Sequence, residues 1–193
     1  MADGRADEAA LLTFGHGTAT EDEIVALLRG AGVASVVDVR RFPGSRAHPH
    51  VARDELSRWL PDAGVAYRWE PRLGGRRARP AEAGERDAWW RIAAFRAYAA
   101  HTRTAEFAAA LDELVAEARA RRTAVLCSES LWWRCHRRIV ADAVVLLGGL
   151  AVAHLGHDGR LVPHVPSAGA RVAPDGLEYP ADAGPEPPPA EAP

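Results

Sequence analysis

The sequence contains no lysine, so each of its 24 basic side chains is an arginine. It has only two cysteines, Cys127 and Cys135, and a single methionine. No apolar run reaches the roughly 18 residues that a membrane-spanning helix needs. The first residues are polar and of mixed charge, unlike a signal peptide. These absences favour a cytoplasmic protein with free thiols and without a membrane partner.

The charges are unevenly distributed along the 193 residues, whose formal net charge is −2. Residues 166–193 hold one arginine and five acidic residues, a net of −4, which leaves +2 for the remainder. Residues 68–103 hold nine arginines against four acids, a net of +5. Because the planar arginine fork matches phosphate and carboxylate groups, this stretch suits an anionic partner.

Apolar runs and helical periodicity predict one α/β domain over residues 11–165. Strands are expected at residues 11–14, 33–39, 65–69, 123–126 and 150–155. Helices are expected at residues 21–29, 53–60, 86–100, 104–120 and 139–147, and a turn or hairpin at residues 156–163. Strand, helix and strand joined by short turns form the βαβ unit of a mostly parallel sheet. We expect a flexible stretch over residues 1–10 and a disordered Pro-, Ala- and Glu-rich tail over residues 166–193.

Polar residues and glycines follow four of the predicted strands. In chain order these are His16; Asp38 and Arg40; Gly74 and Gly75; and Cys127 with Glu129. A parallel sheet places the carboxyl ends of its strands along one edge, where ligands bind. The sequence therefore predicts a pocket at this edge.

The segment over residues 127–138, CSESLWWRCHRR, joins the fourth strand to the following helix. Cys135 and His136 fall at the start of this helix, where nearby arginines and the helix end lower a thiol pKa. The same helix end, with Arg134 and Arg137, favours a bound anion. The alternative interpretation is that both cysteines are small buried hydrophobes that pack and cap the helix.

Three further residues are candidates for proton transfer. His16 lies between glycines and is either a catalytic group or a surface turn histidine. Asp38 ends an apolar strand next to Arg40, so it is either catalytic or half of a structural ion pair. Glu129 is either a general acid or base, or an acceptor for loop amides.

Two familiar patterns fit poorly. Rhodanese and tyrosine phosphatase sites place five residues between a cysteine and an arginine, whereas six residues separate Cys127 from Arg134. A structural zinc site usually has closely spaced ligand pairs, whereas Cys127 and Cys135 are eight positions apart and only His136 adjoins them. A divalent metal such as zinc would still bind if His16 or Asp38 joined these residues in space.

An arginine-rich loop precedes two tryptophans, Trp89 and Trp90. Its arginines are Arg72, Arg76, Arg77 and Arg79. Positive charge combined with aromatic faces can hold phosphates and stack bases. The alternative is a solvated loop followed by tryptophans that pack a helix.

Several motifs together resemble the domain of unknown function 488 family. They are Gly15-His16-Gly17-Thr18; residues 37–40 with Pro43 and Ser45; residues 73–75; Tyr98; Phe107; Cys127-x-Glu129; and Cys135-His136-Arg137. The resemblance extends over about residues 11–165 and implies a Rossmann-like, three-layer α/β sandwich. It implies no particular reaction. In this family the first turn usually reads Gly-His-Ser, so Thr18 carries the hydroxyl one position later here.

The leading hypothesis is an enzyme that acts on a phosphate-bearing substrate, either a nucleotide or a nucleic acid. Cys127 or Cys135 would supply the thiol, with His136, His16, Asp38 and Glu129 as catalytic candidates. Arg40, Gly74, Gly75, Arg134 and Arg137 would bind the anion. The alternatives are a metal-binding domain that uses Cys127, Cys135 and His136, and a non-enzymatic nucleic-acid-binding module. The sequence leaves the oligomeric state open.

Overall fold

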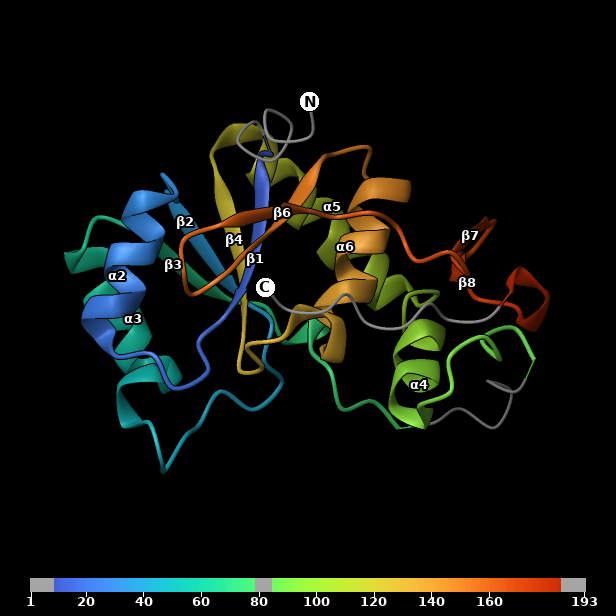
Figure 1. Ribbon diagram of the computed structural model, residues 1–193, viewed down its shortest axis with the longest axis horizontal. Coiled ribbons are helices and arrows are strands. Elements are labelled where there is room, and N and C mark those ends of the chain that lie inside the picture. The colour runs from blue at the N-terminus through green and yellow to red at the C-terminus, as the bar shows by residue number, and fades with distance from the viewer. Residues whose placement is uncertain (1–8, 79–84, 185–193) are drawn as a thin grey trace.

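The computed structural model describes residues 9–78 and 85–184 and contains a six-stranded sheet between two layers of helices (Figure 1). The strand order is β3-β2-β4-β1-β5-β6. The strands are β1 (Leu11–Gly15), β2 (Ser35–Asp38), β3 (Ala66–Trp69), β4 (Thr123–Cys127), β5 (Val152–Leu155) and β6 (Leu161–Pro163). The first five are parallel, and β6 runs antiparallel to β5. The predicted Rossmann-like α/β fold is confirmed.

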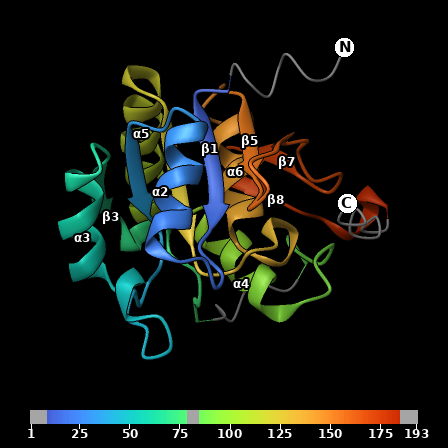
Figure 2. The same cartoon turned by 60° about the vertical axis from the view of Figure 1, so that its left-hand side comes forward.

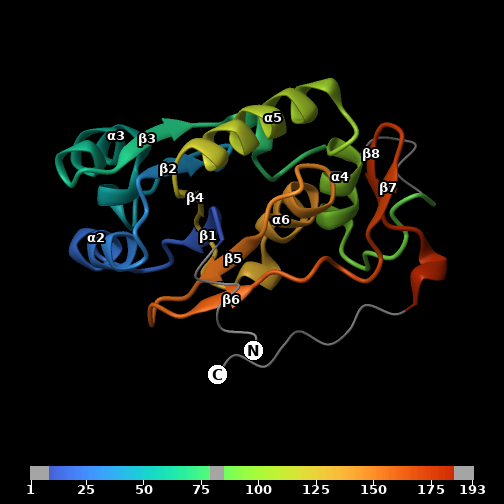
Figure 3. The same ribbon diagram turned by 90° about the horizontal axis from the view of Figure 1, so that it is seen from above.

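Helices cover both faces of the sheet (Figures 2 and 3). One face packs α2 (Glu21–Gly30) and α3 (Arg53–Asp62), and the other packs α4 (Ala93–His101), α5 (Ala105–Ala120) and α6 (Arg137–Leu146). Alternate strand residues enter the two cores, so Leu12 joins α2 and α3 while Leu11 joins α5 and α6. Cys127, at the end of β4, lies on the α6 side.

A capping box begins α2, and the hairpin predicted around residues 156–163 is present. Thr20 accepts a hydrogen bond from the Glu23 amide, and the Glu23 carboxylate accepts from the Thr20 amide, which is the capping box that starts α2. The turn after β5 returns the chain as a hairpin. Both devices satisfy backbone groups that a helix end or sheet edge leaves open.

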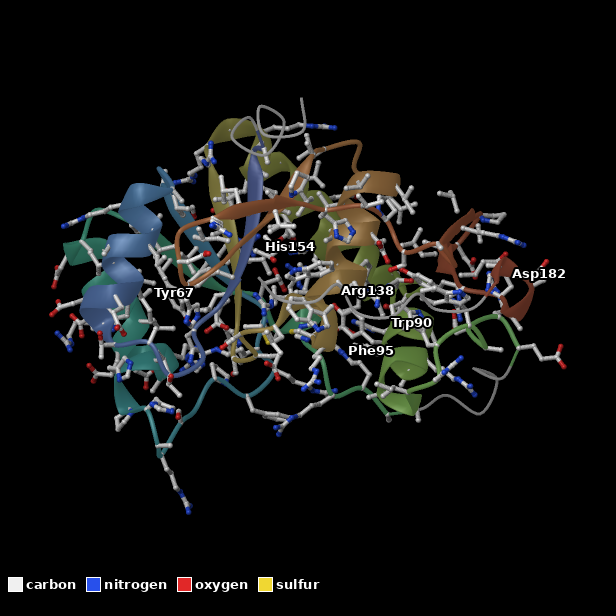
Figure 4. The ribbon with its side chains drawn as sticks, in the orientation of Figure 1. Tyr67, Trp90, Phe95, Arg138, His154 and Asp182 are labelled. Atoms are coloured by element: carbon white, nitrogen blue, oxygen red, sulfur yellow. The ribbon has the colours of Figure 1, made fainter. Side chains whose placement is uncertain are left out.

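The helix predicted from residue 86 begins only at Ala93. Trp89 and Trp90 precede it in a buried turn, where the Trp89 amide donates to the Tyr179 carbonyl. The Arg138 guanidinium lies 4.9 Å from the Trp90 ring centroid (Figure 4). The burial of these indoles against the C-terminal segment overrides local helix propensity.

The C-terminal segment differs from the prediction of disorder beyond residue 165. Its described part, as far as residue 184, contains the hairpin β7 (Arg171–Ala173) and β8 (Gly176–Glu178), and Leu177 and Tyr179 are fully buried. Its composition favours disorder, but a few apolar and aromatic side chains reach the core formed by the preceding domain. The stretches 1–8 and 185–193, also expected to lack order, lie outside the described residues.

Among the described residues, no helix has the length and apolar character required to cross a membrane.

Candidate functional site

A pocket of about 450 Å³ lies at the carboxyl ends of β2 and β4, at the sheet edge that the sequence predicts. Four arginines, Arg40, Arg41, Arg76 and Arg134, line it together with one carboxylate, Glu129. Its other lining residues are Phe42, Gly75, Ile92, Ala94, Phe95, Tyr98, Cys127, Ser128, Cys135 and His136. We call this the arginine pocket. Its excess of positive charge suits an anionic ligand.

A larger cavity, of about 740 Å³, lies between α2 and the turn that joins β5 to β6. Its ionisable residues are Glu23, His157 and Asp158. Glu23 is engaged in the capping box, and the His157 Nε2 donates to the Gly15 carbonyl at 2.6 Å. None of its described lining residues is a cysteine or an arginine, so the smaller pocket is the better candidate for chemistry.

The two cysteines and His136 come together at the inner end of the arginine pocket, and we call these three residues the thiol centre. The Cys127 Sγ lies 4.0 Å from the His136 Nδ1, and the Cys135 Sγ lies 3.6 Å from the same nitrogen. The three potential ligand atoms are within 4.8 Å of one another. Because β4 ends at Cys127 and α6 begins at Arg137, the strand-to-helix connection itself brings them together.

The two thiols of the thiol centre differ in acidity. A hydrogen bond with Cys135, together with burial, raises the pKa of the Cys127 thiol well above its ordinary value. Burial alone would raise the pKa of Cys135, but the Cys127 thiol, His136 and Arg137 together hold it well below its ordinary value. These opposite directions make Cys135 the more acidic thiol of the pair.

Arg137 is a buried cation in contact with the Cys135 sulfur. It is 1% exposed, and its Nε donates to the Cys135 Sγ at 3.3 Å. Its Nη2 donates to the Glu129 carbonyl. The sequence predicts that Arg137 binds a substrate anion, whereas the structure places it behind the sulfur and outside the pocket lining.

Glycines permit the close packing of this site. A Cβ on Gly75 would lie 2.9 Å from the His136 Nδ1, and a Cβ on Gly15 would overlap the Glu129 carbonyl. Gly74 packs against the backbone of Arg41 instead, so only Gly75 of the predicted anion-binding pair lines the pocket. The glycines that the sequence singles out thus act by allowing close approach.

Asp38 and His16 are held outside the thiol centre. The Asp38 carboxylate accepts hydrogen bonds from the Arg40 Nε at 2.8 Å, from the Arg40 Nη2 at 2.6 Å and from the Tyr67 hydroxyl at 2.8 Å. The His16 Nδ1 donates to the Gly17 carbonyl at 2.9 Å. Burial, followed by the charge of Arg40, lowers the pKa of His16 to about 4. Asp38 therefore forms the structural ion pair, and neither residue belongs to the candidate metal-ligand group.

Glu129 lies exposed at the rim of the pocket. Its Oε1 accepts the Leu131 amide at 3.1 Å, which is the structural role that the sequence offers as one alternative.

The arginines of the loop after β3 are mostly engaged. The Arg72 guanidinium contacts the carboxylates of Glu70 and Glu113, each at 2.6 Å, and Arg77 donates to three backbone carbonyls. Arg79 lies outside the described residues. Trp90 is 0% exposed and Trp89 only 4%, so neither presents a face for stacking a base. The tryptophans take the structural alternative, in which they pack against a helix.

A second polar cluster lies between β1, β5 and α6, and the sequence contains no local signal for it. The Thr13 Oγ1 lies 2.7 Å from the His154 Nδ1, the His154 Nε2 lies 2.9 Å from the His164 Nδ1, and the His164 Nε2 lies 2.9 Å from the Asp142 Oδ1. All four residues are buried, and His154 is labelled in Figure 4. We call them the histidine chain. Its hydrogen-bonded partners are separated by up to 141 positions, so only the fold reveals it.

Comparison with known proteins gives one match. No protein of the curated set and no solved structure matches the chain. The family described as Domain of unknown function DUF488 matches residues 20–144. This span includes the thiol centre and the Asp38–Arg40 pair, excludes His16, and contains only Asp142 of the histidine chain. Because the match covers more than half of the sequence, the chain belongs to the DUF488 family.

Proposed function

We propose that the chain is an enzyme that acts on a phosphate-bearing substrate of nucleotide size. The substrate binds in the arginine pocket with its reacting group against the thiol centre. The observation that supports this best is that four arginines and a Cys–Cys–His group line one pocket of about 450 Å³. Ionisable groups that converge in a pocket at the strand ends are typical of a catalytic site.

Two arginines of the pocket are available to a ligand. Within residues 9–78 and 85–184, the guanidinium groups of Arg76 and Arg134 form no hydrogen bond or ion pair. Both side chains are exposed at the mouth of the pocket. Paired arginine forks bind phosphate oxygens through charge-assisted hydrogen bonds. Arg76 also has a φ of 56°, a conformation that non-glycine residues adopt rarely and often near binding sites.

The rim of the pocket is apolar on its other side. Phe42 is 66% exposed and Ile92 is 57% exposed, and both line the pocket together with the largely buried Phe95. Large apolar side chains that remain exposed beside a charged pocket are typical of ligand contact. A flat nucleobase would cover them while the phosphate reaches the arginines. This arrangement favours a nucleotide over a bare phosphate ester.

Isothermal titration calorimetry of the full chain with adenosine monophosphate and with inorganic phosphate tests the proposal. Arg134→Ala and Arg76→Ala should each weaken nucleotide binding by about tenfold, equal to ~1.4 kcal/mol. Phe42→Ala should weaken nucleotide binding but leave phosphate binding unchanged, because it removes only the stacking surface.

Arg160→Ala is the matched control, since Arg160 lies outside the arginine pocket with a side chain that is 71% exposed. Its nucleotide affinity should equal that of the wild type. If Arg134→Ala and Arg76→Ala bind the nucleotide as tightly as Arg160→Ala does, the pocket is not the binding site and the proposal fails.

A further inference from the structure

The strongest unassigned feature is the shape of the thiol centre. Two sulfurs, from Cys127 and Cys135, lie at 4.0 Å and 3.6 Å from one imidazole nitrogen, the His136 Nδ1. All three atoms are within 4.8 Å of one another, and both cysteines are less than 9% exposed. The two cysteines are free thiols.

These distances fit the edges of a metal coordination tetrahedron. Zinc binds sulfur at ~2.3 Å and imidazole nitrogen at ~2.0 Å, so tetrahedral angles place sulfur and nitrogen about 3.6 Å apart and two sulfurs about 3.8 Å apart. The measured sulfur–nitrogen separations of 3.6 Å and 4.0 Å lie close to that edge length. Shortening the distance between the Cys127 Sγ and the His136 Nδ1 by a few tenths of an ångström would bring both sulfurs to the sulfur–nitrogen spacing of zinc ligands.

Hydrogen bonding alone accounts poorly for the arrangement. One ring nitrogen has a single hydrogen or a single lone pair, so it cannot bond well to two sulfurs at once. The opposite nitrogen, the His136 Nε2, is buried and has no hydrogen-bond partner in the described part of the chain. A cation at the Nδ1 would place the ring's proton on the Nε2.

The surroundings suit a site with one open position. Arg137 donates to the Cys135 Sγ from behind, a contact that orients the sulfur and reduces its charge. Cys127, Cys135 and His136 all line the arginine pocket, so the position opposite these three ligands faces its interior. Three protein ligands with a fourth position open to a pocket are characteristic of catalytic rather than structural zinc.

We propose that the Cys127 Sγ, the Cys135 Sγ and the His136 Nδ1 bind one divalent metal ion of the zinc type, whose remaining coordination position opens into the arginine pocket. Two thiolates and an imidazole are ligands that select zinc over magnesium or calcium. The proposal supplies a cofactor for the proposed function and depends on that function only for the role of the open position.

The full chain, purified without a histidine tag, provides the first measurement. Elemental analysis should find about one zinc per chain. After removal of the metal with a chelator, cobalt(II) should bind at one equivalent and give the visible bands of a tetrahedral site together with a thiolate-to-cobalt charge-transfer band. Cobalt that binds without the charge-transfer band, or no stoichiometric metal in either experiment, overturns the proposal.

Variants then assign the ligands. Cys127→Ser, Cys135→Ser and His136→Gln should each weaken zinc binding by at least about a hundredfold in competition with a chromophoric chelator. His48→Gln is the control, because His48 lies outside the candidate ligand group. Circular dichroism must show that each variant folds. If a folded variant of any of the three residues retains wild-type affinity, that residue is not a ligand and the three-ligand site is wrong.

The metal site and the proposed function can fail separately. A chain that binds nucleotide but takes up no stoichiometric metal contradicts the metal site alone. A chain that holds stoichiometric metal but binds no nucleotide contradicts the proposed function alone. Arg134→Ala should retain its full metal content, because Arg134 is not among the candidate ligands.

Discussion

Two polar clusters built on α6 differ in how completely their atoms are paired. The histidine chain reaches this helix through Asp142, and the thiol centre directly precedes it through Cys135 and His136. Trp132, in the connection between the two cysteines, stacks on His154 with ring centroids 3.9 Å apart and planes 6° apart. The two clusters are therefore neighbours with different properties.

The histidine chain is closed. Asp142 is an acceptor, so the His164 Nε2 carries a hydrogen, and with neutral rings His154 donates to His164 and accepts from the Thr13 hydroxyl. Asp142 also accepts from the Ser167 amide at 2.8 Å and from the Tyr179 hydroxyl at 2.9 Å. Burial, followed by the charge of a neighbouring His164, lowers the pKa of His154 well below its ordinary value.

The thiol centre is open. Its imidazole has an unpartnered buried nitrogen in the described structure, and its sulfurs face a pocket. Buried polar groups are almost always paired, so an exception calls for a specific explanation such as a ligand or ion. The full pairing of the closed cluster is typical of a stabilising role, and the open cluster is consistent with the proposed metal site.

Asp142→Ala should have the largest effect on stability. It removes a buried carboxylate that receives three hydrogen bonds and leaves His164, Ser167 and Tyr179 with unsatisfied donors. We expect the free energy of unfolding, measured by urea denaturation, to fall by about 3–5 kcal/mol. Tyr179→Phe removes one of these bonds and should cost only about 1 kcal/mol. An Asp142→Ala loss below that of Tyr179→Phe would contradict the structural role of the histidine chain.

Acid should destabilise the protein through buried neutral histidines, at a pH where most carboxylates remain ionised. His16 has a pKa of about 4 in the fold, against an ordinary histidine pKa of 6.5. Its contribution to stability is therefore fully present above pH 6.5 and is lost as the pH falls toward 4. The unfolded chain binds the extra proton in this window, so stability decreases by about 2 kcal/mol between pH 7 and pH 5. His154 acts in the same direction.

Guanidinium unfolding at the two pH values measures this decrease. The glutamine of His16→Gln cannot be protonated. This variant should therefore lose less unfolding free energy between pH 7 and pH 5 than the wild type, by most of the amount that His16 contributes. An identical pH dependence in the wild type and the variant would show that His16 is not held neutral by the fold.

The sequence predicts the sheet and its edge well, because each strand is a short apolar run and parallel strands align their carboxyl ends. The structure brings Cys127, Cys135 and His136 together, because a strand end and a helix start lie on either side of the connection between the cysteines. The local sequence does not predict whether the side chains at that edge pair with one another or remain free. Asp38 is paired with Arg40 and Tyr67, whereas the Arg134 guanidinium has no partner within the described ranges.

Long-range contacts explain the remaining errors. His154 is buried in contact with Thr13, which belongs to a strand far away in the sequence. Tyr179 is buried because its hydroxyl donates to Asp142 and its ring packs against the indoles of Trp89 and Trp90. No periodicity or spacing in the C-terminal segment signals these partners. Composition therefore indicated disorder where a few specific contacts produce order.

Gly75→Ala should have a small effect on stability and a specific effect on the thiol centre. The added Cβ would lie 2.9 Å from the His136 Nδ1, so the imidazole must shift by a few tenths of an ångström. We expect a loss of about 1 kcal/mol in unfolding free energy together with weaker metal binding. Gly30→Ala is the matched control, because a Cβ there meets no atom within 4 Å, and it should leave stability unchanged or slightly raised. Equal behaviour of the two variants would show that the approach of Gly75 does not hold His136 in place. A larger loss of metal affinity than of stability in Gly75→Ala would show that the fold tolerates a displaced imidazole while the open cluster does not.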